Sequence, residues 1–160
     1  MLKVGDKAPE FETKDESGNQ IRLEDFRGKK VMVYFYPKDN TKGCTAEACS
    51  IRDQFDVFHG NEIPVLGISG GAEKSHRKFK EKYELPFPLL MDEDFQIAKL
   101  YDVYKKKKMY GKEYMGIVRT TFLIDEDGKI EGIFGGPEGI EKVKTKEHAD
   151  QVINFWGLKL

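Results

Sequence analysis

The hydrophobic pattern of the 160-residue chain opens with features of β-structure. Glu10–Lys14 and Gln20–Leu23 flank a cluster of turn residues, Asp15–Gly18, and together they predict a short β-hairpin. An unbroken run of β-branched and aromatic residues at Val31–Tyr36 then predicts a strand that is buried on both faces. A second apolar strand is expected at Pro64–Ser69.

Helical spacing separates and follows these strands. Between Gly43 and Phe58, apolar residues recur at spacings of three and four and predict an amphipathic helix. Its apolar stripe consists of Cys44, Ala48, Ile51, Phe55 and Phe58. Further helices are expected at Ala72–Glu84, Phe95–Tyr101 and Lys146–Trp156. Thr145 is a candidate N-cap for the last of these helices.

A second hairpin is expected late in the chain, where Gly116–Ile124 and Lys129–Phe134 flank the turn sequence Asp125–Gly128. The basic run Lys105–Lys108 before it is typical of a solvated loop or helix end. Strand–helix–strand units imply parallel neighbours covered by helices, and the late hairpin adds antiparallel strands. We therefore expect one α/β domain over residues 1–160. The expected fold is thioredoxin-like, with a mixed central sheet flanked by helices and an N-terminal β-hairpin.

Composition narrows the functional classes. The formal net charge is −1, from 27 basic and 28 acidic residues, and does not indicate a nucleic-acid partner. No apolar run approaches the ~18 residues of a transmembrane helix, and the N-terminus lacks the apolar stretch of a secretory signal. We therefore expect a cytoplasmic protein without membrane contact. Only two cysteines are present, and in a reducing compartment cysteines are more often catalytic, redox-active or metal-bound than structural.

The segment between the first buried strand and the first long helix carries the candidate chemistry. Pro37–Gly43 leaves the carboxyl end of that strand, a position that ligand and catalytic groups favour. A helix start presents unpaired N–H groups and a partial positive charge, and both stabilise the thiolate, which is the reactive form of cysteine. Cys44 lies at this start, although its place on the apolar stripe equally fits a small buried hydrophobe.

The motif Pro37-x-x-x-Thr41-x-x-Cys44 resembles the active site of the peroxiredoxin family. The bacterioferritin-comigratory-protein (PrxQ-type) branch of that family is especially similar in the wider string FYPKDNTKGCTAEAC. One departure is Lys42, which stands where this branch usually carries proline, so the loop is expected to be less stiff. The resemblance covers nearly the whole chain, because the strings GDKAPEF near the start and RTTFLID from Arg119 onward also match.

The resemblance implies a role for each residue of the motif. Cys44 would be the peroxidatic cysteine, Thr41 would hydrogen-bond the thiolate and the peroxide, and Pro37 would shield the thiolate. Arg119 would place a permanent cation beside the sulfur, although a strand arginine by itself more often forms a surface ion pair. The implied activity is a thiol-dependent peroxidase that reduces hydrogen peroxide and organic hydroperoxides without a cofactor or a metal.

Thiolate formation cannot account for the whole rate of such an enzyme. A free cysteine is already a few per cent thiolate near neutral pH, so complete ionisation gains only about 30-fold, whereas enzymes commonly supply about a million-fold or more. Most of the acceleration must therefore come from polarising and aligning the O–O bond. The groups available for this are Thr41, Arg119 and the backbone N–H groups.

The second cysteine, Cys49, lies five residues after Cys44 and away from the apolar stripe, near Asp53 and Asp56 on the helical wheel. In an ideal helix this spacing separates the two Cα atoms by ~8.6 Å, whereas a disulfide needs about 6.8 Å or less. A disulfide between them would require the first helical turns to unwind. The resemblance implies that Cys49 resolves the sulfenic acid of Cys44 and that a thioredoxin-like or other disulfide reductant reopens the bond. We expect a monomer or weak dimer.

Two other functions use the same residues. Cys44 and Cys49 could bind a metal ion together with a histidine, but no CxxC or HxxxH pattern is present. The candidate histidines are His59, His76 and His148. The chain could instead be a redox sensor or holdase in which oxidation unwinds the helix and exposes apolar surface. Turnover separates this alternative from an enzyme, because a sensor oxidises once whereas an enzyme consumes many peroxides.

Overall fold

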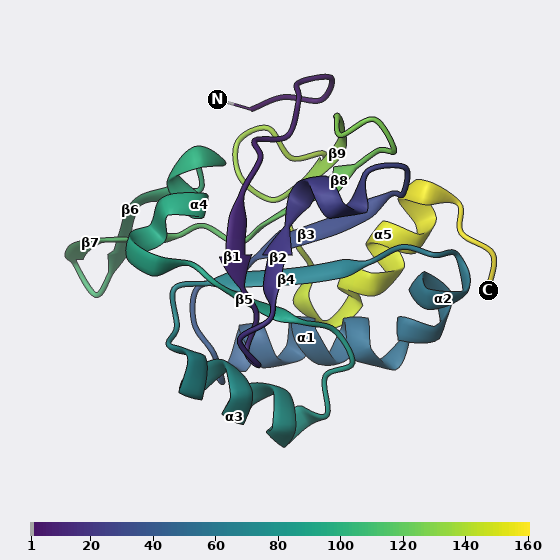
Figure 1. Ribbon diagram of the computed structural model, residues 1–160. Coiled ribbons are helices and arrows are strands. Elements are labelled where there is room, and N and C mark those ends of the chain that lie inside the picture. The colour runs from purple at the N-terminus through teal and green to yellow at the C-terminus, as the bar shows by residue number, and fades with distance from the viewer. Residues whose placement is uncertain (1) are drawn as a thin grey trace.

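A five-stranded mixed sheet runs through the centre of the computed structural model, which describes residues 2–160 (Figure 1). In spatial order its strands are β5 (Leu89–Met91), β4 (Val65–Ser69), β3 (Val31–Phe35), β8 (Thr120–Ile124) and β9 (Ile130–Phe134). The neighbours β3, β4 and β5 are parallel, whereas β8 is antiparallel to β3 and to β9. The expected mixed sheet is confirmed. The short edge strand β5 was not predicted from the sequence.

Helices and a hairpin cover the two faces of this sheet (Figure 1). One face packs against the larger layer, made of α1 (Lys42–Asp53), α2 (Phe55–Gly60), α3 (Glu73–Tyr83) and α5 (His148–Trp156). The other face carries α4 (Gln96–Leu100), the 3-10 turns η1 (Leu23–Phe26) and η2 (Glu93–Phe95), and the hairpin of β1 (Glu12–Lys14) and β2 (Gln20–Arg22). The N-terminal hairpin is therefore confirmed, and the arrangement is thioredoxin-like.

The central strand β3 is buried on both faces, as its composition predicts. Val31, Val33 and Phe35 enter the core on the α4 side, whereas Met32 and Tyr34 enter the core beneath α1 and α5. Each of the five side chains is 2% exposed or less. Because two layers hold β3, the end of this strand is a fixed point from which the loop to α1 starts.

The long helix expected from Gly43 to Phe58 is two helices. The α1 helix ends at Asp53, Gln54 leaves helical geometry with φ −117° and ψ 19°, and α2 follows. The apolar spacing of the stripe continues through the break, so the pattern does not reveal it. The expected cap at Thr145 is also wrong, because Thr145 begins a 3-10 turn, η3 (Thr145–Glu147), and α5 starts after it.

The strand expected at Gly116–Ile124 is interrupted at Val118 and Arg119. Residues before the break belong to β7 (Lys112–Ile117), which lies in a separate hairpin, and residues after it belong to β8 in the central sheet. At this break, Val118 donates its backbone N–H to the carbonyl oxygen of Val103 across 2.8 Å. The break places Arg119 at the start of β8, outside both ladders.

The basic run Lys105–Lys108 is neither a loop nor a helix end. It lies in β6 (Tyr104–Met109), which pairs with β7 in an antiparallel hairpin. Tyr110 and Gly111 join the two strands with φ of 53° and 77°, the left-handed backbone of a two-residue hairpin turn. The lysines misled the prediction because four consecutive lysines show no alternation of polar and apolar residues, which is the sequence signal of a strand.

Candidate active site

The residues singled out from the sequence meet where β3 ends. Phe35 pairs with Thr120 in the antiparallel register, so Arg119 lies beside the exit of β3. Pro37 begins the loop that leads from this exit into α1, and Cys44 lies in the first turn of that helix with 1% of its surface exposed. The fold thus brings together a thiol and a guanidinium that are 75 residues apart in the sequence.

Arg119 contacts two groups on α1. Its Nη2 donates to Sγ of Cys44 across 3.5 Å, and its Nη1 donates to Oε1 of Glu47 across 2.7 Å. Glu47 is fully buried and lies three residues after Cys44, which places both on one face of the helix. A Cβ atom at Gly43 would lie 3.0 Å from Nη2 of Arg119, so this glycine leaves the space that the guanidinium occupies.

The charges around Arg119 keep it a cation. Burial lowers the pKa of Arg119, but the charges of Glu47 and Cys44 outweigh it and raise the pKa above its ordinary value. Burial raises the pKa of Glu47, and the charges of His148 and Arg119 oppose that rise. The second carboxyl oxygen of Glu47 makes no hydrogen bond within residues 2–160 and lies 3.7 Å from Nε2 of His148. The buried carboxyl group of Glu47 therefore binds Nη1 of Arg119, while Nη2 of the same guanidinium faces the sulfur of Cys44.

Thr41 occupies the N-cap position of α1, with φ −96° and ψ 161°, but its hydroxyl does not cap the helix. The hydroxyl donates instead to the carbonyl oxygen of Lys38 across 3.0 Å, so the hydrogen bond expected from Thr41 to the sulfur of Cys44 is not made in this structure. A hydroxyl that has given its only proton to a carbonyl keeps its lone pairs, so it can accept a hydrogen bond from an incoming O–H group. Thr41 is exposed, and Pro37 is half-buried.

Cys49 lies in the same uninterrupted helix as Cys44, and both thiols are free. It is partly exposed, as its place off the stripe predicts. Burial raises the pKa of Cys49, the charge of Arg52 opposes the rise, and the charge of Asp53 adds to it. Helical geometry separates the two cysteine Cα atoms by ~8.6 Å, beyond the ~6.8 Å limit for a disulfide. A bond between them requires part of α1 to unwind.

Two residues of the site were missed in the sequence. Glu47 fits the helical spacing of the buried stripe, but a carboxylate is ordinarily read as a surface residue. Lys107 was counted with the solvated lysines, yet it is half-buried and its Nζ donates to the carbonyl oxygen of Ile117 across 2.9 Å. Burial and the charge of Arg119 lower the pKa of Lys107, and the charge of Cys44 opposes that fall.

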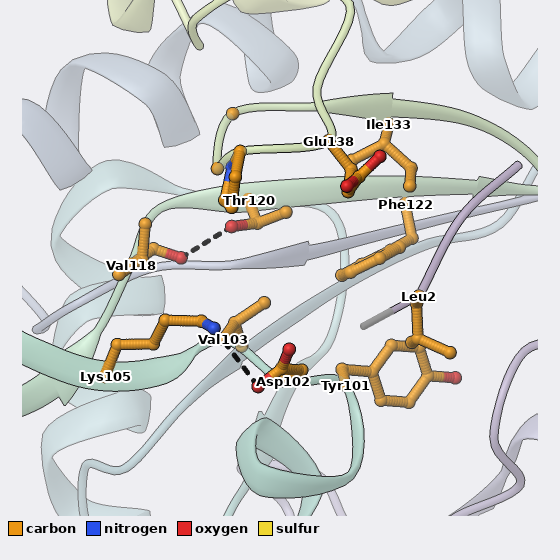
Figure 2. Close-up of a pocket in the computed structure, with 13 residues that line it drawn as sticks. Leu2, Tyr101, Asp102, Val103, Lys105, Val118, Thr120, Phe122, Ile133 and Glu138 are labelled. Carbon is orange, nitrogen blue, oxygen red and sulfur yellow. Dashed lines mark hydrogen bonds and ion pairs between the residues drawn. The ribbon is translucent and has the colours of Figure 1, made fainter.

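Figure 2 shows a pocket whose apolar lining belongs to the core on the α4 side of the sheet. Cys44 belongs to the core on the other side. The volume of the pocket is about 30 Å³, which is room for about two water molecules. Tyr101, Phe122 and Ile133 line its apolar part, and all three belong to the core on the α4 side. The pocket therefore does not reach the sulfur. The candidate site at Cys44 is defined by the contacts between side chains described above.

The three histidines lie apart from the two thiols. His76 and His148 are fully buried, and both ring nitrogens of each have other partners, whereas His59 stacks on Phe55. Within residues 2–160, no three side chains of His, Cys, Asp or Glu gather in a way that could hold a metal ion. No helix in this described part of the chain is long and apolar enough to cross a bilayer.

Residues 4–133 match the model of the AhpC/TSA family. The chain belongs to this family. It is 46% identical over 154 residues to peroxiredoxin Bcp of Escherichia coli (strain K12), which covers 96% of this chain and 95% of that protein. It is 43% identical over 152 residues to peroxiredoxin Bcp of Bacillus subtilis (strain 168), covering 95% and 93%.

Solved structures of peroxiredoxins agree with this assignment. A cysteine-to-serine variant of peroxiredoxin Q from Xanthomonas campestris superimposes with a TM-score of 0.83 at 35% identity, covering 92% of this chain and 90% of that one. A PrxQ variant from Xylella fastidiosa gives a TM-score of 0.88 at 31% identity, covering 98% and 96%. The expected peroxiredoxin branch and fold are thus confirmed. Peroxiredoxins are thiol-dependent peroxidases, which take a peroxide as substrate and need a reductant.

Proposed function

We propose that Cys44 is the peroxidatic cysteine of this peroxiredoxin and that Arg119 activates the peroxide beside it. The observation that carries the proposal is the 3.5 Å contact between Nη2 of Arg119 and Sγ of Cys44, at the N-terminal turn of α1. The Cys44 thiolate attacks one peroxide oxygen and becomes a sulfenic acid, and the other oxygen leaves as water or an alcohol after taking a proton. The guanidinium and the helix N–H groups stabilise the charge that develops during this displacement.

Two further residues complete the proposed site. Thr41 accepts a hydrogen bond from the O–H of the peroxide, because its own proton is engaged by the Lys38 carbonyl. Pro37 shields one side of the sulfur from solvent. The Xanthomonas campestris bacterioferritin comigratory protein reduces alkyl peroxides, which supports hydrogen peroxide and organic hydroperoxides as the substrates of this chain.

Cys49 is the proposed resolving cysteine. Its thiolate attacks the sulfenic sulfur of Cys44, a disulfide forms, and hydroxide leaves and is protonated to water. The helical separation of the two residues means that the first turns of α1 unwind before this step. A thioredoxin-like reductant then reopens the disulfide. When peroxide is abundant, a sulfenic acid that waits for unwinding is exposed to over-oxidation to the sulfinic acid. The proposed form is a single-domain, cytoplasmic protein that is a monomer or weak dimer.

Peroxide consumption with a thioredoxin system tests the cycle. The native chain is compared with Cys44→Ser and with Cys49→Ser, both of which keep a polar atom of similar size. We expect sustained turnover in the native chain and none in Cys44→Ser. Cys49→Ser should consume about one equivalent of peroxide and stop, because its sulfenic acid lacks a resolving thiol.

The same experiment separates the enzyme from a redox sensor. A sensor would consume one equivalent in the native chain and remain oxidised in the presence of reductant. Turnover that survives in Cys49→Ser would instead show that a thiol of the reductant resolves the sulfenic acid directly. Mass spectrometry of the oxidised native chain should find the bond between Cys44 and Cys49.

A further inference from the structure

A buried hydrogen bond between a carboxyl group and an imidazole ring joins the active-site loop to α3. Asp39 lies in the loop between Pro37 and Thr41, and only 7% of its surface is exposed. Its Oδ2 is 2.6 Å from Nδ1 of His76, which lies on α3 and is fully buried. Nε2 of His76 is 3.0 Å from the carbonyl oxygen of Leu90, at the edge strand β5. The loop is thus connected through one imidazole ring to both a helix and the sheet.

Hydrogen bonds surround the contact between Asp39 and His76. A carbonyl oxygen can only accept, so Nε2 of His76 carries a proton. Burial raises the pKa of Asp39, but hydrogen bonds from His76, Tyr36 and Ser75 outweigh burial and lower it. Because both oxygens of this buried carboxyl group have hydrogen-bond partners, the loss of a partner leaves a buried polar group unsatisfied, which is costly.

The next loop residue is also held by α3. Asn40 has a left-handed backbone with φ 58°, and its Oδ1 accepts from Nζ of Lys82 across 3.4 Å and from Oη of Tyr83 across 3.2 Å. Thr41 follows directly, and α1 begins at the residue after it. Two consecutive anchors on α3 therefore precede the helical turn that carries Cys44. Neither anchor contacts the sulfur.

We propose that His76 is a positioning residue which, through Asp39, holds Thr41 and the first turn of α1 in the arrangement that reacts with peroxide. The same contact resists the unwinding that brings Cys44 to Cys49. This inference rests on the proposed two-cysteine cycle. The two chemical steps need opposite states of the loop, since peroxide attack uses the folded turn and disulfide formation uses the unwound one. A residue that stabilises the folded turn therefore speeds the first step and slows the second.

His76→Asn tests the inference, because an amide cannot donate to both Asp39 and the Leu90 carbonyl in the geometry of a ring. Reaction of Cys44 with hydrogen peroxide is measured by stopped flow in a Cys49→Ser background, and disulfide formation is measured in chains with both cysteines after one equivalent of peroxide. We expect the first rate to fall about tenfold or more, since small misplacements of reacting groups are costly. The second rate should rise about tenfold, since a hydrogen bond to a charged group contributes at least that factor to a local opening equilibrium.

Ser75→Ala provides a milder variant in case His76→Asn does not fold. It removes one donor from the same oxygen of Asp39, at 2.8 Å, and leaves the contact between Asp39 and His76 in place. Both effects should appear with the same signs at about threefold. Ile130→Ala is the control for stability alone, because it empties a core position in β9, at the other edge of the sheet. It should lower the melting temperature and leave both rates unchanged.

The opposed signs decide the outcome. If both rates fall, or neither changes, or Ile130→Ala gives the same split, His76 is merely structural and the inference is overturned. Failure of the proposed cycle looks different, because the native chain itself would then form no Cys44 sulfenic acid or no bond to Cys49. In that case there is no unwinding step for His76 to control, and both proposals are wrong.

Discussion

The two cysteines of α1 occupy one helix but two electrostatic environments. Cys44 is almost completely buried, yet it lies at the positive end of the helix with a guanidinium 3.5 Å from its sulfur. Cys49 is more exposed and lies in the middle of the helix, where burial raises its pKa and the charges of Arg52 and Asp53 act in opposite directions. Exposure alone would favour Cys49 as the more reactive thiol, whereas the proposed mechanism assigns the attack on peroxide to Cys44. The difference comes from where the helix begins and from which cation reaches it.

This comparison also explains how one helix can serve two successive reactions. In the proposed cycle, the first turn holds a sulfur that reacts while the helix is intact, because its contact with Arg119 and with the helix N–H groups belongs to that state. The later turns carry a thiol whose raised pKa keeps it mostly protonated, so it does not compete for peroxide. Cys49 becomes useful only when the first turn has unwound.

The largest effect is expected from Arg119→Lys. Lysine keeps the positive charge but lacks the planar fork, so it cannot bond Glu47 and Cys44 at the same time. Reaction of Cys44 with hydrogen peroxide should slow about 100-fold or more, which is the usual cost of removing one donor that stabilises developing charge. The measurement is a stopped-flow rate, set against the thiolate fraction from ultraviolet absorbance. A rate that falls only in step with the thiolate fraction would show that Arg119 acts on the sulfur alone.

Short spacings in the sequence identify the motif residues Pro37, Thr41 and Cys44. The family resemblance adds Arg119, which is far from them in the sequence. The buried partner of Arg119 was not found, since a glutamate on a helix is ordinarily solvated and only the tertiary fold supplies its guanidinium. The helical spacing places Glu47 on the apolar stripe. A carboxylate at a position otherwise occupied by buried residues is the feature of the sequence that indicates a buried partner for Arg119.

Backbone irregularities were the hardest features to predict. The apolar period passes through Gln54 unchanged, so periodicity could not separate α1 from α2. Likewise, Gly116–Ile124 is predicted as one strand, and its interruption arises because the chain moves from the hairpin sheet to the central sheet. That interruption is what frees Arg119 from the ladders. The overall fold was accessible because β3 and the helices carry strong periodic signals, whereas breaks between elements depend on tertiary contacts.

A smaller effect is expected from the two charges beside Cys49. Its raised pKa means that disulfide formation should accelerate as the pH rises, through and beyond the range in which free thiols ionise, because the thiolate attacks. Arg52→Gln removes a charge that lowers this pKa and should slow disulfide formation several-fold near neutral pH. Asp53→Asn should speed it by a similar factor. Both effects are about threefold to fivefold for charges this exposed.

Quenched-flow measurement of disulfide formation, with the rate of Cys44 oxidation recorded in parallel, checks these opposite signs. The oxidation rate should be the same in both variants, since neither charge faces Cys44. If Arg52→Gln and Asp53→Asn change disulfide formation in the same direction, the effect comes from helix stability rather than from the thiolate of Cys49. The comparison between the two halves of α1 would then concern folding and not electrostatics.

The smallest effect, from Lys107, tests how far the environment of Cys44 extends beyond α1. The Nζ of Lys107 holds the carbonyl oxygen of Ile117, two residues before Arg119, and its pKa is lowered by burial and by the charge of Arg119. Lys107→Met should slow the reaction of Cys44 with peroxide about threefold, the scale of one lost hydrogen bond.

Lys106→Met is the matched control, because the side chain of Lys106, which precedes Lys107 in the sequence, is 78% exposed. Because its pKa is lowered, Lys107 should lose its charge at a lower pH than ordinary lysines do. The difference in reaction rate between the native chain and Lys107→Met should therefore shrink at alkaline pH, below the range in which ordinary lysines lose their charge. An equal loss in both variants would mean that the charge of the whole hairpin acts on Cys44, not the contact that Lys107 makes.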